Sequence, residues 1–253
     1  MRGFIAFSKK ELTENTRNFR LLIMLAIFLI FGLMSPLLAK FTPQLMEALM
    51  PNLAEAFENP TALDSWMQFY KNVSSLGLSL TIILFSSCLS GEYAKGTLTI
   101  MLTKGLSRPA VVLSKFSAAA IILTVSYWLS FGVTYGYTAY LWPGASLPHV
   151  FFAACALWIA GILYLCILML GCVLFQQAFT SILFLLVITV IMGLLEQIEQ
   201  TAGFSPVILV SKNIDLLSGA VTVSYFTIPF IVSIFTSAAL LIMSIVVFNK
   251  KQL

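Results

Sequence analysis

Long apolar stretches without charge, separated by short charged segments, dominate the chain. Residues 21–39 and 72–91 contain no Asp, Glu, Lys or Arg. A bilayer core of ~30 Å needs about 20 apolar residues of helix. Each stretch is therefore long enough to cross a membrane, and the pattern predicts spanning helices.

The remaining apolar sequence divides into four more spans. Residues 116–195 also lack Asp, Glu, Lys and Arg, but Trp142-Pro143-Gly144 and Gln176-Gln177 interrupt them. Pro and Gly together favour a turn, and two adjacent amides mark a polar step. We expect a single all-α transmembrane domain over residues 1–253, with six spans at about 21–39, 72–91, 113–141, 149–175, 179–196 and 226–248.

The basic residues predict the orientation of these spans. Eleven of the 14 Lys and Arg residues fall in residues 1–20, 92–115, 176–178 and 249–253. Cytoplasmic segments carry the excess of Lys and Arg. We therefore expect both ends of the chain to be cytoplasmic and residues 40–71 and 197–225 to be extracytoplasmic. The first span lacks a cleavage site and is expected to be retained, in a multi-pass protein of a cell membrane, most simply the bacterial plasma membrane.

Composition excludes several classes of function. The chain is 60% hydrophobic and 9% charged, which is too apolar for a soluble domain. Its basic residues flank apolar stretches and form no stripe for nucleic acid. The 4 cysteines lie inside the apolar stretches without a CxxC pair, and His149 is the single histidine. We expect neither a disulfide nor a metal site.

Motifs for catalysis are also missing from the sequence. It contains no HExxH and no GxSxG. Residues 91–97 read GEYAKGT, which has the two glycines of a phosphate-binding loop but lacks the Lys after the second glycine. We therefore predict that the chain is not an enzyme and binds no cofactor. If ATP is used, another chain binds it.

The segment before the first span has the pattern of a basic amphipathic helix. An apolar stripe of Phe4, Phe7, Leu12 and Phe19 alternates with charged residues in residues 1–20. Such a helix usually lies in the membrane interface. Two interpretations stay open, a short anchoring tail and an elbow helix that transmits force.

Residues 40–71 predict two short helices. Thr42-Pro43 has the form of a helix start, and Asn59-Pro60 of its end. Thr61, followed by Asp64, resembles a capping box that begins the second helix. Its aromatic residues Trp66, Phe69 and Tyr70 are expected to belong to the aromatic belt of the membrane interface.

The predicted cytoplasmic loop, residues 92–112, contains an apolar group. Leu98, Met101 and Leu102 have helical spacing, so a helix over about 94–103 gathers them into an apolar knob. Gly105 is expected to end this helix and Pro109 to open the next. An apolar knob needs a covering surface, either the membrane or a partner protein.

Two further patterns concern helix packing. Gly132 and Gly136 form a GxxxG pair, which allows two helices to approach closely. It fits packing within the chain as well as between two copies. Residues 197–225 are too apolar for a free loop, and short helices that dip back into the outer leaflet fit them.

Together these features resemble the permease subunits of type-2 ATP-binding-cassette exporters. The resemblance rests on the basic amphipathic helix, the six spans and the loop Glu92…Lys95-Gly96-Thr97-Leu98…Leu102. It implies that the loop is a coupling helix that docks on a separate cytoplasmic ATPase, which holds ATP and Mg²⁺. The implied contact residues, with the neighbouring apolar side chain, are Glu92, Lys95, Gly96, Thr97, Leu98, Met101 and Leu102.

The function expected from this resemblance is export. The permease would act as a dimer, with a second copy or a paralogue, and the path would lie between the two in the lipid bilayer. Uncharged spans favour an amphipathic or hydrophobic cargo, such as a peptide toxin, a drug or a lipid-like molecule. The alternatives are a membrane immunity or scaffold protein that binds a toxin without transport, and a membrane-bound enzyme.

Overall fold

The protein is a bundle of long helices. The computed structural model describes residues 2–49, 59–94, 96–103, 105–145, 147–198 and 203–251, and these ranges contain helices and no strand. The helices in chain order are α1 (Arg2–Arg17), α2 (Arg20–Leu49), α3 (Ala62–Asn72), the π-helical turn η2 (Val73–Gly77), α4 (Leu78–Ala94), α5 (Thr97–Thr103), α6 (Arg108–Leu141), α7 (Val150–Phe175), α8 (Ala178–Glu196), α10 (Ile208–Ser211), α11 (Asn213–Leu217) and α12 (Val223–Lys250).

The expected number of spans is confirmed for the described residues. Six helical segments are long and apolar enough to cross a membrane. They are Arg20–Gln44, Ala62–Tyr93, Arg108–Leu141, Val150–Phe175, Ala178–Glu196 and Val223–Lys250. The predicted interruptions also occur, because a turn with Gly144 at a φ of 83° separates α6 from α7. Gln176, at a φ of 59°, separates α7 from α8.

Helix α2 continues through both of its prolines, so the expected new helix at Thr42-Pro43 is wrong. Pro36 and Pro43 both lie inside α2. A proline leaves the carbonyl four residues earlier without its usual donor. For Pro36 this is the carbonyl of Gly32, which accepts a hydrogen bond from the Thr134 hydroxyl of α6 at 3.2 Å. A hydroxyl from a neighbouring helix thus satisfies the freed carbonyl, as membrane helices allow.

The second span is longer than expected, because α3, η2 and α4 form one continuous helical segment. Its start is the predicted capping box, in which the Thr61 N–H donates to Asp64 Oδ2 at 2.7 Å. Trp66, Phe69 and Tyr70 are 0–3% exposed. Assigning them to a lipid-facing belt is therefore wrong. The Trp66 ring lies 5.3 Å from that of Phe131 on α6, so these aromatics pack the interior.

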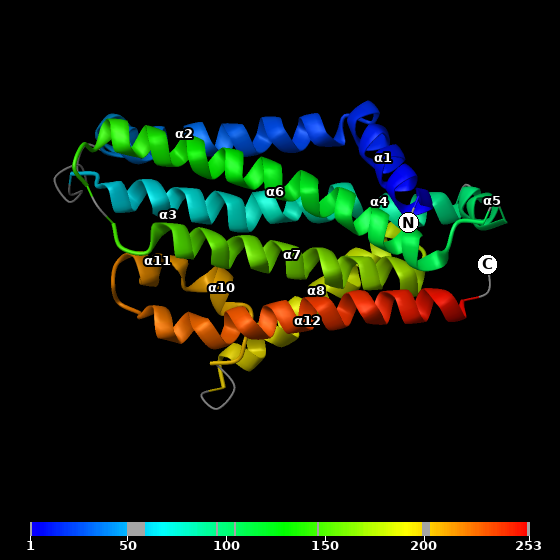
Figure 1. Cartoon of the computed structure of the whole chain (residues 1–253). Helices are drawn as coiled ribbons and strands as arrows, with labels where there is room; N and C mark the ends of the chain where they lie inside the picture. Colours follow the sequence, from blue (N-terminus) through cyan, green and yellow to red (C-terminus); the bar gives the residue numbers. More distant parts are fainter. Residues whose placement is uncertain are drawn as a thin grey trace.

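Helix α7 lies in the middle of the bundle, with α6 on one side and α12 on the other (Figure 1). The short helices α10 and α11 bury Ile208, Leu209, Leu216 and Leu217 to 0–1% exposure. This explains why residues 197–225 are too apolar for a free loop. The start of α1, the end of α12 and helix α5 lie at the same end of the bundle, called the α5 end below (Figure 1).

Candidate functional site at the α5 end

Helix α1 directs a partly polar face into the bundle. Phe7, Glu11 and Asn15, spaced four residues apart, are 8%, 3% and 3% exposed. Phe4 and Phe19 are 38% and 63% exposed. The predicted apolar stripe therefore does not form the inner face, and one carboxylate of this helix is buried.

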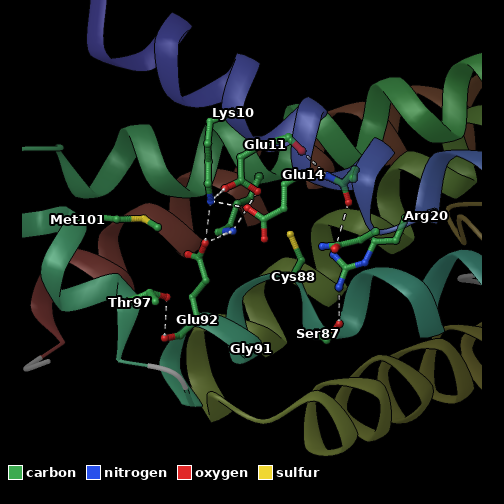
Figure 2. Close-up of a pocket in the computed structure, with 13 residues that line it drawn as sticks. Lys10, Glu11, Glu14, Arg20, Ser87, Cys88, Gly91, Glu92, Thr97 and Met101 are labelled. Atoms are coloured by element: carbon green, nitrogen blue, oxygen red, sulfur yellow. Dashed lines mark hydrogen bonds and ion pairs between the residues drawn. The ribbon is translucent and has the colours of Figure 1, made fainter.

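The buried carboxylate belongs to a cluster of charges from three helices (Figure 2). Lys115, near the start of α6, has a side chain only 2% exposed. Its Nζ lies 3.1 Å from Glu11 Oε2 of α1 and 3.0 Å from Glu92 Oε1 of α4. One ammonium group thus joins three helices beside the predicted coupling loop. Buried charges persist only when paired in this way.

Lys10 adds a second, more exposed cation to this charge cluster. Its Nζ lies 3.0 Å from Glu11 Oε1, 2.5 Å from Glu14 Oε2 and 3.4 Å from Glu92 Oε1. Burial alone would lower the pKa of Lys10, but the hydrogen bonds to Glu14 and Glu11 outweigh it and raise that pKa. The hydrogen bond from Lys10 in turn lowers the pKa of Glu14. Both groups therefore stay charged at neutral pH.

The same three carboxylates are the residues that could hold a metal ion. Oxygen atoms of Glu11, Glu14 and Glu92 all lie within 4.8 Å of one another. The Lys10 ammonium contacts all three carboxylates and serves as their cation. With Lys115 as a second positive charge, two cations face three carboxylates. The three carboxylates and two ammonium groups thus form a junction between α1, α4 and α6.

A polar cavity of about 400 Å³ lies beside the charge cluster, and Glu92 lines it. Among the described residues, the buried Oε2 of Glu92 has no hydrogen-bond partner. Arg20, at the start of α2, also lines the cavity and donates to Ser87 Oγ at 2.8 Å and Asn15 Oδ1 at 3.4 Å. The first turn of α2 is thereby tied to α1 and α4.

Helix α5 directs Leu98 into the protein. Leu98 is 1% exposed and belongs to the main apolar core, against which the partly buried Met101 and Leu102 pack. The expected exposed knob is therefore wrong for Leu98, because the bundle itself covers this side chain. The three side chains hold α5 against the ends of the neighbouring helices.

The exposed residues described around α5 are small or polar. Gly96 and Thr103 are exposed, and Thr97 is half-buried. Lys95 lies outside the described residues. Gly105 ends the helix as predicted, in a left-handed conformation, with its N–H donating to Leu102 O and that of Leu106 to Met101 O. Of the implied ATPase contacts, Glu92 and Leu98 are thus internal, whereas Gly96 and Thr97 lie nearer the surface.

The GxxxG pair lies away from this site. Gly132 and Gly136 are exposed on α6, and no described atom would lie within 4 Å of a Cβ added at either. Packing of this pair within the chain is therefore excluded for the described residues. Among the described glycines, the tightest approach is at Gly32 of α2, where an added Cβ would lie 2.8 Å from the Ser130 carbonyl oxygen.

Sequence reasoning missed the two residues at the centre of the charge cluster, Glu11 and Lys115. They are separated by 104 positions in the chain. A signal for Glu11 was present, since it shares a face with Phe7 and Asn15 at helical spacing. Lys115 belongs to the stretch Ser107-Arg108…Lys115 that resembles the exporter family, but nothing in that stretch indicated that the side chain is buried.

Comparison with known proteins decides the family. The model of the family described as ABC-2 family transporter protein matches residues 5–253. The chain belongs to the ABC-2 transporter family. This ABC-2 protein is accordingly a multi-pass membrane protein of a transporter family.

A curated relative agrees with membership in a membrane protein family. The ABC-2 chain is similar to the uncharacterized transmembrane protein YxlG of Bacillus subtilis (strain 168). The two are 22% identical over 166 residues, which cover 63% of this chain and 64% of the relative. The match thus spans somewhat less than two thirds of the relative's length and adds no cargo.

Proposed function

We propose that the chain is the permease subunit of an ABC exporter, driven by ATP hydrolysis on a separate cytoplasmic ATPase. The observation that carries the proposal is the junction of Glu11, Glu92 and Lys115 directly beside the α4–α6 loop. This loop joins α4 to α6 and contains α5. Glu92 lies in the last turn of α4, just before the loop, and Lys115 lies in the first turns of α6, just after it. A displacement of the loop therefore acts on α1, α4 and α6 together.

The ATPase would contact the outer surface of the loop, around Gly96, Thr97 and Thr103. The ATPase shifts the permease between two conformations only if it binds them with different free energies. Leu98 and Glu92 transmit this shift from inside the bundle. Because both side chains are buried, the loop moves together with the ends of the neighbouring helices. This assigns α1 the role of a force-transmitting elbow rather than of an anchoring tail.

The cargo class we propose is amphipathic or hydrophobic. At the opposite end of the bundle, a cavity of about 660 Å³ is lined by Trp66, Tyr135 and Phe151 among others. No described Asp, Glu, Lys or Arg lines this cavity, and Thr138 and His149 contribute its polar side chains. Apolar walls with a small number of polar groups are typical of sites for largely apolar ligands. Two copies, or one copy and a paralogue, would enclose the complete path.

Co-purification with the ATPase tests the docking surface. Thr103→Trp places a bulky side chain on the outer surface of the loop and should abolish co-purification of the ATPase from the membrane. Ala220→Trp is the matched control, since Ala220 is exposed far from α5, next to α11. Undiminished ATPase binding by the Thr103 variant would contradict docking at this surface.

Vesicle uptake tests the cargo class and the remaining alternative. ATP-dependent movement of an amphipathic peptide or lipophilic compound supports an exporter, whereas movement restricted to small hydrophilic solutes contradicts the cargo class. Binding of a toxin without ATP-dependent movement would instead indicate an immunity or scaffold protein.

A further inference from the structure

A second set of polar contacts lies at the other side of the α4–α6 loop, where α12 ends. Nη1 of Arg108, the first residue of α6, lies 2.9 Å from the carbonyl oxygens of Phe248 and Asn249 and 2.6 Å from that of Lys251. The guanidinium group is also 5.9 Å from the centre of the Phe248 ring. The exit of the loop is thereby bound to the end of α12.

Lys251 continues the connection from α12 to α7. Its Nζ donates to the carbonyl oxygens of Val173 and Leu174, both at 2.7 Å. Tyr93, at the entrance of the loop, completes the group, since its ring lies 6.4 Å from that of Phe248 and 5.9 Å from Lys251 Nζ. Arg108 and Lys251 with their carbonyl partners are called the carbonyl clasp below.

The clasp has a clear physical basis. The last four carbonyls of a helix lack donors within the helix, and the helix dipole places partial negative charge at the same end. Arg108 supplies a cation and donor to α12, and Lys251 supplies one to α7. Each contact is a hydrogen bond from a charged donor, which is stronger than one between neutral groups.

The loop is therefore fastened at both of its ends, to different helices. At its entrance, Glu92 is bound through Lys115 and Lys10 to α6 and α1. At its exit, Arg108 is bound to α12, and through Lys251 to α7. The charge cluster contains no residue of α7 or α12, so it is the carbonyl clasp that brings charged donors to the ends of these two helices.

We propose that Arg108 and Lys251 are positioning residues that pass the displacement of the α4–α6 loop to the ends of α7 and α12. The proposal rests on the proposed function, because the displacement comes from the ATPase. In this scheme, ATPase docking moves two groups of helices: α1, α4 and α6 through the charge cluster, and α7 and α12 through the carbonyl clasp. Losing the clasp should uncouple the second group while the ATPase still docks.

Hydrogen exchange of the purified permease in lipid nanodiscs tests the clasp without any ATPase. Lys251→Met should accelerate amide exchange in the last turn of α7 by about fivefold, since the carbonyls of Val173 and Leu174 lose a charged donor. Lys251→Arg should restore slow exchange. Lys250→Met is the matched control, because it removes the same charge from an exposed neighbouring position. Unchanged exchange in Lys251→Met would overturn the proposal, whatever the fate of the proposed function.

Transport by the complete complex with its ATPase tests the role in coupling. Arg108→Met and Lys251→Met should lower the cargo moved per ATP hydrolysed by about 3- to 30-fold. This fold-change corresponds to the amount by which mutations between two distant sites change the coupling energy of those sites. Lys251→Arg and Lys250→Met should keep the wild-type ratio. A wild-type ratio in both Met variants would overturn the coupling role. Failure of the wild-type permease to retain any ATPase would instead refute the proposed function.

Discussion

At the scale of single residues, the most consequential side chain is Lys115. It is 2% exposed, and its two partners, Glu11 and Glu92, have side chains 4% and 10% exposed. Withdrawing such groups from water is unfavourable, and their mutual attraction must offset it. A junction of this kind adds little net stability. It does, however, strongly penalise any arrangement that separates α1, α4 and α6, which is what a force-transmitting contact requires.

Removing Lys115 alone should be more harmful than removing the whole triad. Lys115→Met removes the buried cation and leaves Glu11 and Glu92 with only the more exposed Lys10, so it should lower the free energy of unfolding by about 3–5 kcal/mol. The triple variant Lys115→Met, Glu11→Gln, Glu92→Gln should recover most of this loss. Thermal unfolding of the detergent-solubilised protein measures both. Additive losses in the triple variant would show that the three side chains act independently.

At the scale of elements, the contact between α2 and α6 depends on the absence of a side chain at Gly32. An added Cβ there would meet the carbonyl oxygen of Ser130 at 2.8 Å and its Cα at 3.2 Å. Both are backbone atoms, so no rotamer change relieves the overlap. The close approach also brings the Thr134 hydroxyl to the Gly32 carbonyl that Pro36 leaves without a donor. One small residue thus permits both the packing and the proline.

Two glycine substitutions separate this packing role from helix propensity. Gly32→Ala should force α2 and α6 apart and lower the free energy of unfolding by about 1–3 kcal/mol, as overpacking does. Gly132→Ala, where nothing is within 4 Å, should leave the free energy of unfolding unchanged or raise it by up to ~1 kcal/mol. The unfolding temperatures of the two variants measure this difference in stability, and equal shifts would contradict the assigned role of Gly32.

At the scale of the whole molecule, the described chain places every polar coupling contact at one end of the bundle. Helix α5 and the two ends of the described chain lie there, whereas α11 lies towards the other end (Figure 1). The charge cluster and the carbonyl clasp lie on either side of the loop that contains α5, and the aromatic cavity is lined by the end of α6 and the start of α7. The basic residues counted along the sequence predict that the α5 end faces the cytoplasm. In the proposed function, the ATPase acts at the α5 end and the aromatic cavity lies towards the opposite end, so the length of the spans separates the two.

Cysteine labelling in intact cells tests this orientation. In a variant without native cysteines, Ser107→Cys at the α5 end should be protected from a membrane-impermeant maleimide until the cells are opened. Ala220→Cys, beyond α11, should react in intact cells. Both positions are exposed, so exposure does not explain a difference. The reverse pattern of labelling would place the ATPase surface outside the cell and refute the proposed function.

The features that depend on neighbouring residues could be predicted from the sequence. Apolar length defined six spans, Trp142-Pro143-Gly144 and Gln176-Gln177 separated them, and Gly105 ended α5. These follow from local physics, because a span must satisfy its own backbone and a turn needs residues that allow its dihedral angles.

Which side chains meet depends instead on how the helices pack in the folded chain. This packing turned Glu11 and Leu98 inwards, kept Pro43 inside α2 and left Gly132 and Gly136 facing outwards. The reason is that the partners come from remote segments: Lys115 lies 104 positions from Glu11, and Arg108 lies 140 positions from Phe248. Those partners decide whether a charge can be buried and whether the carbonyl that a proline leaves unpaired finds a donor, and no local pattern encodes them.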